Sequence, residues 1–507
     1  MPTKQSRHTG RHFLQIPGPT PVPDRVLSAM SRQMLDHRGL EFAEFGAKLF
    51  GNVRSLFKTT NPVLIYPSSG TGAWESGLVN TLSPGDRILL VETGQFAVLW
   101  RNMAEKLGLK PEVIPTDWRS GADPNAIEAR LKKDKAHDIK AVCVVHNETS
   151  TGTRTWVDQV RKAMDAARHP ALLMVDTVSS LATMDYHHDE WSVDVAISGS
   201  QKGLMLPPGL SFTALSQKAI AASKTAKLPR SYWSWDDMLA TNANGTFPYT
   251  PAGGLLFGLA ETIEILHEEG LDNVFARHDR LAEAVRRAVR AWGLEIWCRD
   301  PKAYSPAVTA VAVPETHNAD AFRKLVLDNF DMSLGTGLNK LAGKAFRIGH
   351  LGHTNELTIC GALCGVEMGL ELAGIPHEKG GVAAAMACLA ETARPATARA
   401  AGPRAASVSG RARPRRARSG IFCRAGRISV QRSSSPWRPS ATGRRTGGVR
   451  RPRRPRATAA SPPVGASAPR VLQWGSSTRA RTPRKRSNGS FTPPLLTRIE
   501  GGATPRA

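Results

Sequence analysis

Short apolar runs alternate with amphipathic segments over the first half of this 507-residue chain. The runs are rich in Val, Ile and Leu and four to six residues long, which is typical of buried strands. They cover residues 63–66, 87–92, 112–115, 141–146, 172–176, 193–198 and 210–215. The segments between them, such as 97–107 and 156–167, repeat apolar residues at helical spacing. This alternation predicts an α/β fold with a mainly parallel seven-stranded sheet and helices on both faces.

The segments on either side of the sheet region have different patterns. Prolines at every second position from 17 to 23 oppose a regular helix, so residues 1–23 are predicted to form an extended arm. A helix is predicted from Asp24, which is placed to cap it. Its apolar face is predicted to hold Val26, Leu27, Met30 and Met34. Residues 255–292 have the pattern of long helices, and the chain up to about residue 390 again alternates strand and helix.

These patterns divide the chain into four predicted parts. After the arm, residues 24–265 form a large domain around the sheet, and residues 266–391 form a smaller α/β domain. Residues 392–507 are rich in Arg, Pro, Ala, Ser and Gly and have no sustained periodicity. A segment of that composition cannot bury enough apolar surface to offset the entropy of ordering it, so we predict a disordered tail.

The formal net charge of +25 is confined to this tail. Residues 392–507 contain 26 Arg and one Lys against a single acid, which leaves residues 1–391 with a net charge of −1. One explanation is an arm that binds nucleic acid by counterion release. The other is translation of GC-rich DNA in a shifted reading frame, which the excess of Arg over Lys favours.

One stretch, VDVAISGSQKGLMLPPG at residues 193–209, places a single lysine directly after a buried strand. Small residues follow the strand, and the Pro-Pro-Gly cluster predicts a tight loop. In α/β proteins, chemistry gathers at the carboxyl ends of the strands. Desolvation there favours a neutral amine, which attacks carbonyl carbons. Lys202 is therefore a candidate nucleophile, although most lysines in proteins are solvated surface charges.

Asp176 strengthens this interpretation. It ends the preceding apolar run and lies 26 positions before Lys202. An acid at one strand end and a lysine at the next suit pyridoxal phosphate, because the acid pairs with the pyridinium nitrogen and the lysine holds the aldehyde.

Six motifs occur in the order known from one protein family: FLQIPGPTPVP, SSGTGAWE, HNETSTG, VDTVSS, SGSQKGLMLPPGL and FRIGHLG. With them the chain resembles the class V, fold-type I aminotransferases, and most closely the serine–glyoxylate and alanine–glyoxylate aminotransferases. The resemblance extends from about Gly18 to about Ala390. It implies the fold-type I architecture, pyridoxal 5'-phosphate as cofactor, and a homodimer with shared active sites.

The turn after the first apolar run is a candidate phosphate site. Small residues at Ser69, Gly70 and Thr71 let backbone N–H groups and a helix N-terminus approach an anion. Most turns of this composition are tight turns that bind no ligand. The resemblance of this turn to the family's phosphate loop favours phosphate binding. The resemblance also implies that Thr246, in NGTFPYTP, reaches the phosphate from the neighbouring subunit.

The resemblance implies further cofactor contacts. Family members carry a tryptophan at the position of Thr93 that stacks on the pyridine ring, so this sequence departs from them. Phe96 either supplies the ring instead or packs in the core. Thr149, in HNETSTG, matches the residue whose hydroxyl bonds the cofactor's phenolic oxygen and adjoins the substrate. Ser200 and Gln201 resemble family residues near the phosphate.

Substrate recognition is predicted at Arg347, in FRIGHLG. A planar guanidinium binds a carboxylate through two hydrogen bonds, and amino acids and keto acids both offer that group. In the family this arginine comes from the small domain. His37 and Arg38 resemble the region that lines the substrate entrance.

The sequence therefore predicts transamination of glyoxylate to glycine with serine or alanine as amino donor. Two alternatives remain. A cysteine desulfurase on the same fold needs a mobile cysteine, but Cys360 and Cys364 lie in an apolar helical pattern that predicts core packing. A nucleic-acid-binding protein acting through the tail is the second, and the near-neutral charge of residues 1–391 argues against it.

The cysteines, histidines and apolar segments of the sequence limit the kinds of site and the cellular compartment that we expect. Six cysteines without a CxxC pair do not form a disulfide framework, and His146 has no second ligand at metal-binding spacing. The basic N-terminus lacks an apolar segment, and no run of 18 apolar residues predicts a membrane span. A reducing cytoplasm is the expected compartment.

Overall fold

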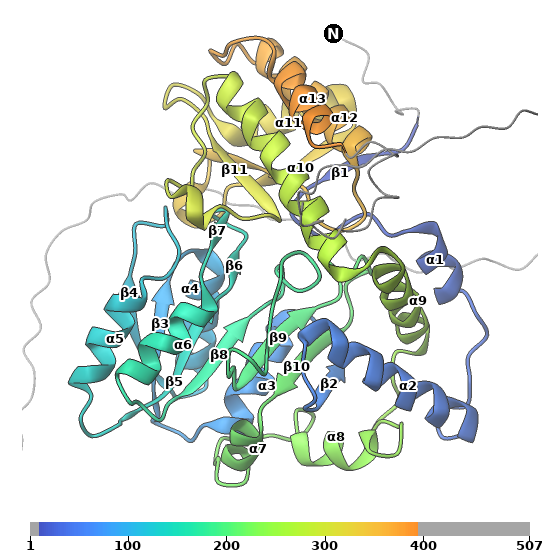
Figure 1. The fold of residues 1–507 in the computed structure, drawn as a ribbon, viewed down its shortest axis with the longest axis vertical. Coiled ribbons are helices and arrows are strands. Elements are labelled where there is room, and N and C mark those ends of the chain that lie inside the picture. Colours follow the sequence, from blue (N-terminus) through green and yellow to red (C-terminus); the bar gives the residue numbers. More distant parts are fainter. Residues whose placement is uncertain (1–9, 394–507) are drawn as a thin grey trace, which may run out of the picture. The chain divides into compact units, whose positions relative to one another are not determined.

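The computed structural model describes residues 10–393, so the predicted tail lies outside the described residues. The described residues fall within one compact unit, Met1–Ser407, and the division into domains at residue 265 stays a prediction. They are organised around a seven-stranded sheet and a four-stranded sheet (Figure 1).

The larger sheet has the strand order β2-β10-β9-β8-β5-β3-β4. Its strands are β2 (Val63–Tyr66), β3 (Arg87–Glu92), β4 (Lys110–Pro115), β5 (Ile139–Val145), β8 (Leu172–Asp176), β9 (Val195–Gly199) and β10 (Ser211–Leu215). Of the seven strands, β10 alone runs in the opposite direction to the others, so its pairings with β2 and β9 are antiparallel and the rest are parallel. All seven predicted strands are present, and three have the predicted bounds. The prediction of a mainly parallel α/β sheet is confirmed.

Alternate side chains of the strands enter two hydrophobic cores, one on each face of this sheet. Val63 and Ile65 belong to a core with helices α2 (Leu40–Phe57), α5 (Pro124–Lys133), α6 (Val157–Ala166) and α9 (Gly253–Glu269). Leu64 and Tyr66 belong to the opposite core with α3 (Gly70–Thr81), α4 (Gln95–Lys106), α7 (Gln217–Ser223) and α8 (Trp235–Asn242). Because a strand turns successive side chains to opposite faces, unbroken apolar runs give a sheet covered on both sides.

The smaller sheet has the order β1-β12-β13-β11, and helices pack against it in a third core. The strands are β11 (Val308–Ala312), β12 (Met332–Thr336), β13 (Ala345–Gly349) and β1 (Phe13–Gln15). The helices are α10 (Leu271–Ala291), α11 (Ala319–Phe330), α12 (Glu356–Leu372) and α13 (Gly381–Glu391). Figure 1 shows β1, in blue, beside yellow and orange elements from the other end of the described chain. A stretch of the predicted arm is thus a strand that pairs with β12 in parallel.

Helix α1 (Asp24–Met30) is shorter than predicted. Its N-cap is Pro23, and Asp24 makes no capping hydrogen bond, so the predicted cap is wrong. Val26 is fully buried, whereas Leu27 is 46% exposed and Met34, which lies beyond the helix, is 61% exposed. The predicted apolar face is therefore wrong at Leu27, which points outward, and at Met34, which the helix does not reach.

Two short elements complete the description. The hairpin β6 (Asn147–Glu148) and β7 (Thr153–Arg154) follows β5 and turns the chain back at the end of the large sheet. Short 3-10 turns lie at Pro301–Ala303 and Asn339–Leu341. No helix of the described residues is long and apolar enough to cross a membrane.

Candidate active site

A cavity of about 280 Å³ lies where several strands of the large sheet end. Asp176 is the last residue of β8, Thr149 follows β5, and Lys202 follows β9. Because parallel strands end on one edge of a sheet, these side chains meet although they are far apart in the sequence. The cavity is lined by Gly18, Pro19, Ser69, Gly70, Thr71, Trp74, Phe96, Val145, Asn147, Thr149, Asp176, Val178, Ser179, Gln201, Lys202 and Pro208.

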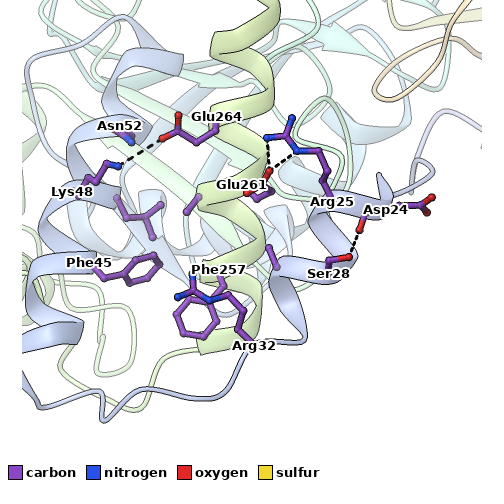
Figure 2. Close-up of a pocket in the computed structure, with 13 residues that line it drawn as sticks. Asp24, Arg25, Ser28, Arg32, Phe45, Lys48, Asn52, Phe257, Glu261 and Glu264 are labelled. Atoms are coloured by element: carbon purple, nitrogen blue, oxygen red, sulfur yellow. Dashed lines mark hydrogen bonds and ion pairs between the residues drawn. The ribbon is translucent and has the colours of Figure 1, made fainter. Parts of the chain in front are cut away.

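A larger cavity of about 650 Å³ lies between α1, α2 and α9. Figure 2 shows that its charged side chains face one another across it. Arg25 pairs with Glu261 at 2.7 Å, and Lys48 lies 3.9 Å from Glu264. No residue that the sequence singled out for chemistry lines this cavity, so we place the active site in the smaller one.

Asp176 is a buried carboxylate held in a fixed orientation. Its Oδ1 accepts a hydrogen bond from the backbone N–H of Val178 at 2.7 Å, and its Oδ2 accepts one from the Trp74 indole at 3.0 Å. Burial, with a smaller effect from the charge of Glu148, raises the pKa of Asp176 to about 7. A cation placed beside this carboxylate would favour its ionised form, so the site is suited to a protonated ring nitrogen.

Lys202 is buried on the loop after β9. Its Nζ donates a hydrogen bond to the backbone carbonyl of Pro17 at 2.5 Å. Burial, followed by the positive charge of Arg347, lowers the pKa of Lys202 from its ordinary 10.5 to about 8. More of the neutral, nucleophilic amine is therefore present near neutral pH than on a surface lysine.

The predicted phosphate turn opens helix α3. Ser69 is its N-cap, and no side chain caps the helix, so its first backbone N–H groups are free to meet an anion. A Cβ at Gly70 would lie 2.6 Å from a methyl group of Val178, so a larger residue does not fit there. The amide oxygen of Gln201 is buried in the cavity wall without a hydrogen-bond partner among residues 10–393.

Glu148 is a buried acid that the sequence reasoning did not single out. Its carboxylate accepts hydrogen bonds from the backbone N–H groups of Phe96 and Ala97, at 3.1 and 3.3 Å. It also accepts from the backbone N–H of Ser150 at 3.0 Å. These bonds fix the start of α4, which carries Phe96, to the loop that carries Thr149. Two walls of the cavity are thus held together by one carboxylate.

Arg347 lies in β13, behind Thr149, and does not itself line the cavity. Its Nη1 donates to the backbone carbonyl of Thr149 and its Nε to that of Thr336, both at 2.8 Å. Burial lowers the pKa of Arg347 to about 10, so the guanidinium remains charged at neutral pH.

Four predicted residues lie away from the cavity. The Ser200 hydroxyl donates to the carbonyl of Pro207 and accepts from the N–H of Leu210, which closes the lysine loop. The Thr246 hydroxyl donates to the carbonyl of Thr241 in the segment between α8 and α9. His37 and Arg38 bond each other at 2.6 Å just before α2. Ligand binding by these four residues remains a prediction.

Several cavity residues were missed. Trp74 stacks on Trp100 and donates its indole N–H to Asp176. Its position as the one aromatic residue among the small residues of SSGTGAWE could have identified it as a cavity residue. Val178, two residues after Asp176, packs against the phosphate turn. Gly18 and Pro19 come from the arm, and no local pattern tied them to Lys202.

The described cysteines do not contribute to the cavity. The five cysteines among residues 10–393 are all free thiols. Cys360 is partly buried against the third core, but Cys364 is exposed, so the predicted core packing is wrong for Cys364. Among these residues there is also no cluster of His, Cys, Asp or Glu that could hold a metal ion.

The cavity fits the cofactor that the sequence predicted. It offers a buried carboxylate for a pyridinium nitrogen, a lysine amine for an aldehyde, and an uncapped helix N-terminus for a phosphate. Phe96 and Val178 line the space between these groups, where an aromatic ring needs apolar surfaces.

Comparison with known proteins agrees with this geometry. The family model described as aminotransferase class-V matches residues 12–341. A serine–glyoxylate aminotransferase of Hyphomicrobium methylovorum is 52% identical over 365 residues, which are 71% of this chain and 90% of that protein. An L-aspartate–glyoxylate aminotransferase of Paracoccus denitrificans is 44% identical over 74% of this chain and 96% of that protein. The crystal structure of pyridoxamine–pyruvate aminotransferase from Mesorhizobium loti superposes with a TM-score of 0.71 and 27% identity, covering 77% of this chain and all of that one.

Proposed function

This chain belongs to the class-V aminotransferase family and uses pyridoxal phosphate, and from that premise we propose that it transfers the amino group of serine or alanine to glyoxylate. The products would be glycine and hydroxypyruvate or pyruvate. The observation that carries the proposal is the cavity that brings Lys202 and Asp176 together at the ends of β9 and β8. The identity to serine–glyoxylate aminotransferases supports glyoxylate as acceptor.

When bound, pyridoxal phosphate supplies an aldehyde and a ring that withdraws electrons from the amino acid's Cα. Asp176 would face the ring nitrogen and keep a proton there, since its carboxylate is buried and already oriented by Trp74 and Val178. Lys202 would hold the aldehyde carbon until the amino acid replaces it. Its released Nζ would then take the proton from Cα as base and, as acid, deliver it to the carbon that was the cofactor's aldehyde carbon.

Arg347 would bind the carboxylate shared by the amino acid and the keto acid. Two of its nitrogens already bond backbone carbonyls, which fixes the guanidinium plane and leaves the second terminal nitrogen for the substrate. Arg347→Ala is expected to raise KM for serine and glyoxylate by about 10- to 100-fold, because a hydrogen bond to a charged group contributes about 1.5–3 kcal/mol. Arg347→Lys, which keeps the charge without the planar fork, should fall between wild type and alanine. Steady-state kinetics with both substrates measure this, and unchanged KM values would remove Arg347 from the substrate site.

We further propose a homodimer in which each chain completes the partner's active site. Within one chain, the turn predicted to bind phosphate offers only the uncharged residues Ser69, Gly70 and Thr71. Thr246 of the same chain lies outside the cavity, where its hydroxyl donates to the carbonyl of Thr241. The family resemblance assigns Thr246 to the neighbouring site. Thr246→Ala is expected to weaken cofactor binding, and light scattering should show a dimer.

Mixing variants tests whether the sites are shared. Lys202→Ala and Thr246→Ala chains would each be impaired alone. A hybrid dimer has one site with Lys202 from one chain and Thr246 from the other, so activity should reappear after subunit exchange. A mixture no more active than its parts would mean that Thr246 does not act across the interface.

The donor and acceptor can be tested directly. The purified full-length chain, with pyridoxal phosphate and glyoxylate, should form glycine when serine or alanine is added. Aspartate is the informative third donor, because Lys202 and Arg347 both have roles already and a second substrate carboxylate would need another cation. Cofactor binding without glycine formation from any of the three would refute the proposed reaction.

A cytoplasmic location is also proposed, on the spacing of the cysteines, which does not suit a disulfide framework. Nucleic-acid binding concerns only the basic residues 392–507, all but two of which lie outside the described residues, and stays a prediction.

A further inference from the structure

Residues 15–20, here called the strap, connect the small sheet to the lysine loop. At one end, the side-chain amide of Gln15 bonds the carbonyl of Gly349 in β13. At the other end, the backbone N–H of Thr20 donates to the carbonyl of Gln201 at 3.1 Å. The hydroxyl of Thr20 donates to the carbonyl of Lys202, also at 3.1 Å. The strap is therefore tied directly to the backbone of the reactive lysine.

The middle of the strap touches the lysine side chain itself. Nζ of Lys202 donates to the carbonyl of Pro17 at 2.5 Å, between residues 185 positions apart. Gly18 has a φ of +99°, a conformation that L side chains rarely adopt. A Cβ at Gly18 would lie 2.4 Å from Cδ of Lys202 and 2.8 Å from its Cε and Nζ. Glycine is thus required here both by the backbone and by the space that the lysine occupies.

The same segment adjoins the predicted substrate arginine. A Cβ at Gly335 in β12 would lie 2.7 Å from Cδ of Pro17 and 2.9 Å from Cβ of Arg347. Pro17 thus lies beside the strand position that carries Arg347, with its carbonyl turned to Lys202.

We propose, resting on the proposed function, that the strap positions the amine of Lys202 whenever that amine is not bonded to the cofactor. The Pro17 carbonyl accepts one N–H, which fixes Nζ and leaves its lone pair free. From that place Nζ would take the proton from the substrate Cα and deliver it to the carbon that was the cofactor's aldehyde carbon, with no net gain or loss of protons. When Lys202 recombines with the cofactor, the amine nitrogen forms a C=N bond with the aldehyde carbon and one water leaves. Gly18 and the Pro17 carbonyl are positioning groups in both steps.

Gly18→Ala tests the proposal, and Gly85→Ala is its matched control. Gly85 has a φ of +84°, so alanine is strained there too, but no atom lies within 4 Å of its added Cβ. Both variants should lose thermal stability to the strain of a positive φ, and Gly18→Ala should lose more, because its Cβ also meets Lys202. The rate to measure is that at which the cofactor-free full-length protein recombines with pyridoxal phosphate, monitored by visible absorbance. Only Gly18→Ala should lower this rate, by at least about tenfold.

Kinetics provide a second readout. Gly18→Ala should lower kcat by at least about tenfold and leave KM for glyoxylate within about twofold, because the amine is displaced and the carboxylate site is kept. A folded Gly18→Ala protein with recombination and kcat within twofold of the Gly85→Ala control would overturn the proposal.

Thr20→Val decides the question if Gly18→Ala does not fold. Valine keeps the shape of threonine but removes the bond to the Lys202 carbonyl. Its control is Thr81→Val, which removes a buried hydroxyl-to-carbonyl bond at the end of α3. Thr20→Val should recombine at least about threefold more slowly than Thr81→Val, and equal rates would overturn the proposal.

Failure of this inference is distinguishable from failure of the proposed function. Recombination needs only the lysine and the aldehyde, and no donor or acceptor acid. A wild-type protein that recombines normally but makes no glycine would refute the proposed reaction and leave the strap experiment valid.

Discussion

Replacing Lys202 with alanine is expected to lower kcat for serine and glyoxylate by at least about a thousandfold, because one side chain serves as covalent anchor, base and acid. Its burial and its pKa of about 8 make the amine suited to all three tasks. Borohydride reduction of the wild-type protein with pyridoxal phosphate should place the label on the Lys202 peptide, by mass spectrometry.

Lys218→Ala is a suitable control for the loss of Lys202. Lys218 also donates its Nζ to a backbone carbonyl, that of Ala171 at 2.8 Å, but it does not line the cavity. The Lys218→Ala variant should therefore retain a kcat close to that of the wild type. Substantial activity in Lys202→Ala, or a label on another lysine, would show that the lysine is wrongly assigned.

Asp176→Asn is expected to lower kcat by about 100- to 4000-fold. Removing one member of a buried charge pair costs about 3–5 kcal/mol, and each 1.4 kcal/mol is tenfold in rate. Asparagine is neutral and cannot hold the charge of a protonated ring nitrogen. Either orientation of its amide also turns an NH₂ group toward an N–H donor, that of Trp74 or that of Val178.

Two further variants separate the charge of Asp176 from its place in the fold. Asp134→Asn removes another buried carboxylate, which bonds the Ile139 N–H and His169 outside the cavity, and should cost stability without a comparable loss of kcat. Trp74→Phe keeps the Asp176 charge and removes one of its two donors, so its kcat should lie between wild type and Asp176→Asn. Stopped-flow turnover and thermal melting of all three measure both effects. If Asp176→Asn loses only stability, Asp176 does not act on the cofactor.

Much of the large sheet follows from local pattern. Apolar runs such as those at residues 63–66 and 172–176 are long enough and apolar enough to be strands buried on both faces, and they are β2 and β8. Small residues and prolines after such a run mark its end, which is why Asp176 and Lys202 could be placed at strand ends. The end of α1 was predicted less accurately, since the apolar spacing continues to Met34 but the helix ends at Met30.

The sequence by itself determined the α/β class, the succession of strands along the chain, and the placement of Asp176 and Lys202 at strand ends. Apolar runs and the small or turn-forming residues that follow them are local patterns, which neighbouring residues are enough to define. Only the tertiary structure decided that Phe13–Gln15 joins β12, that the Trp74 indole bonds Asp176, and that the Pro17 carbonyl bonds Nζ of Lys202. These contacts join residues 102 to 319 positions apart, with bonds to backbone carbonyls or single side chains. A backbone carbonyl is present at every residue, so no composition or spacing indicates which one a distant lysine will meet.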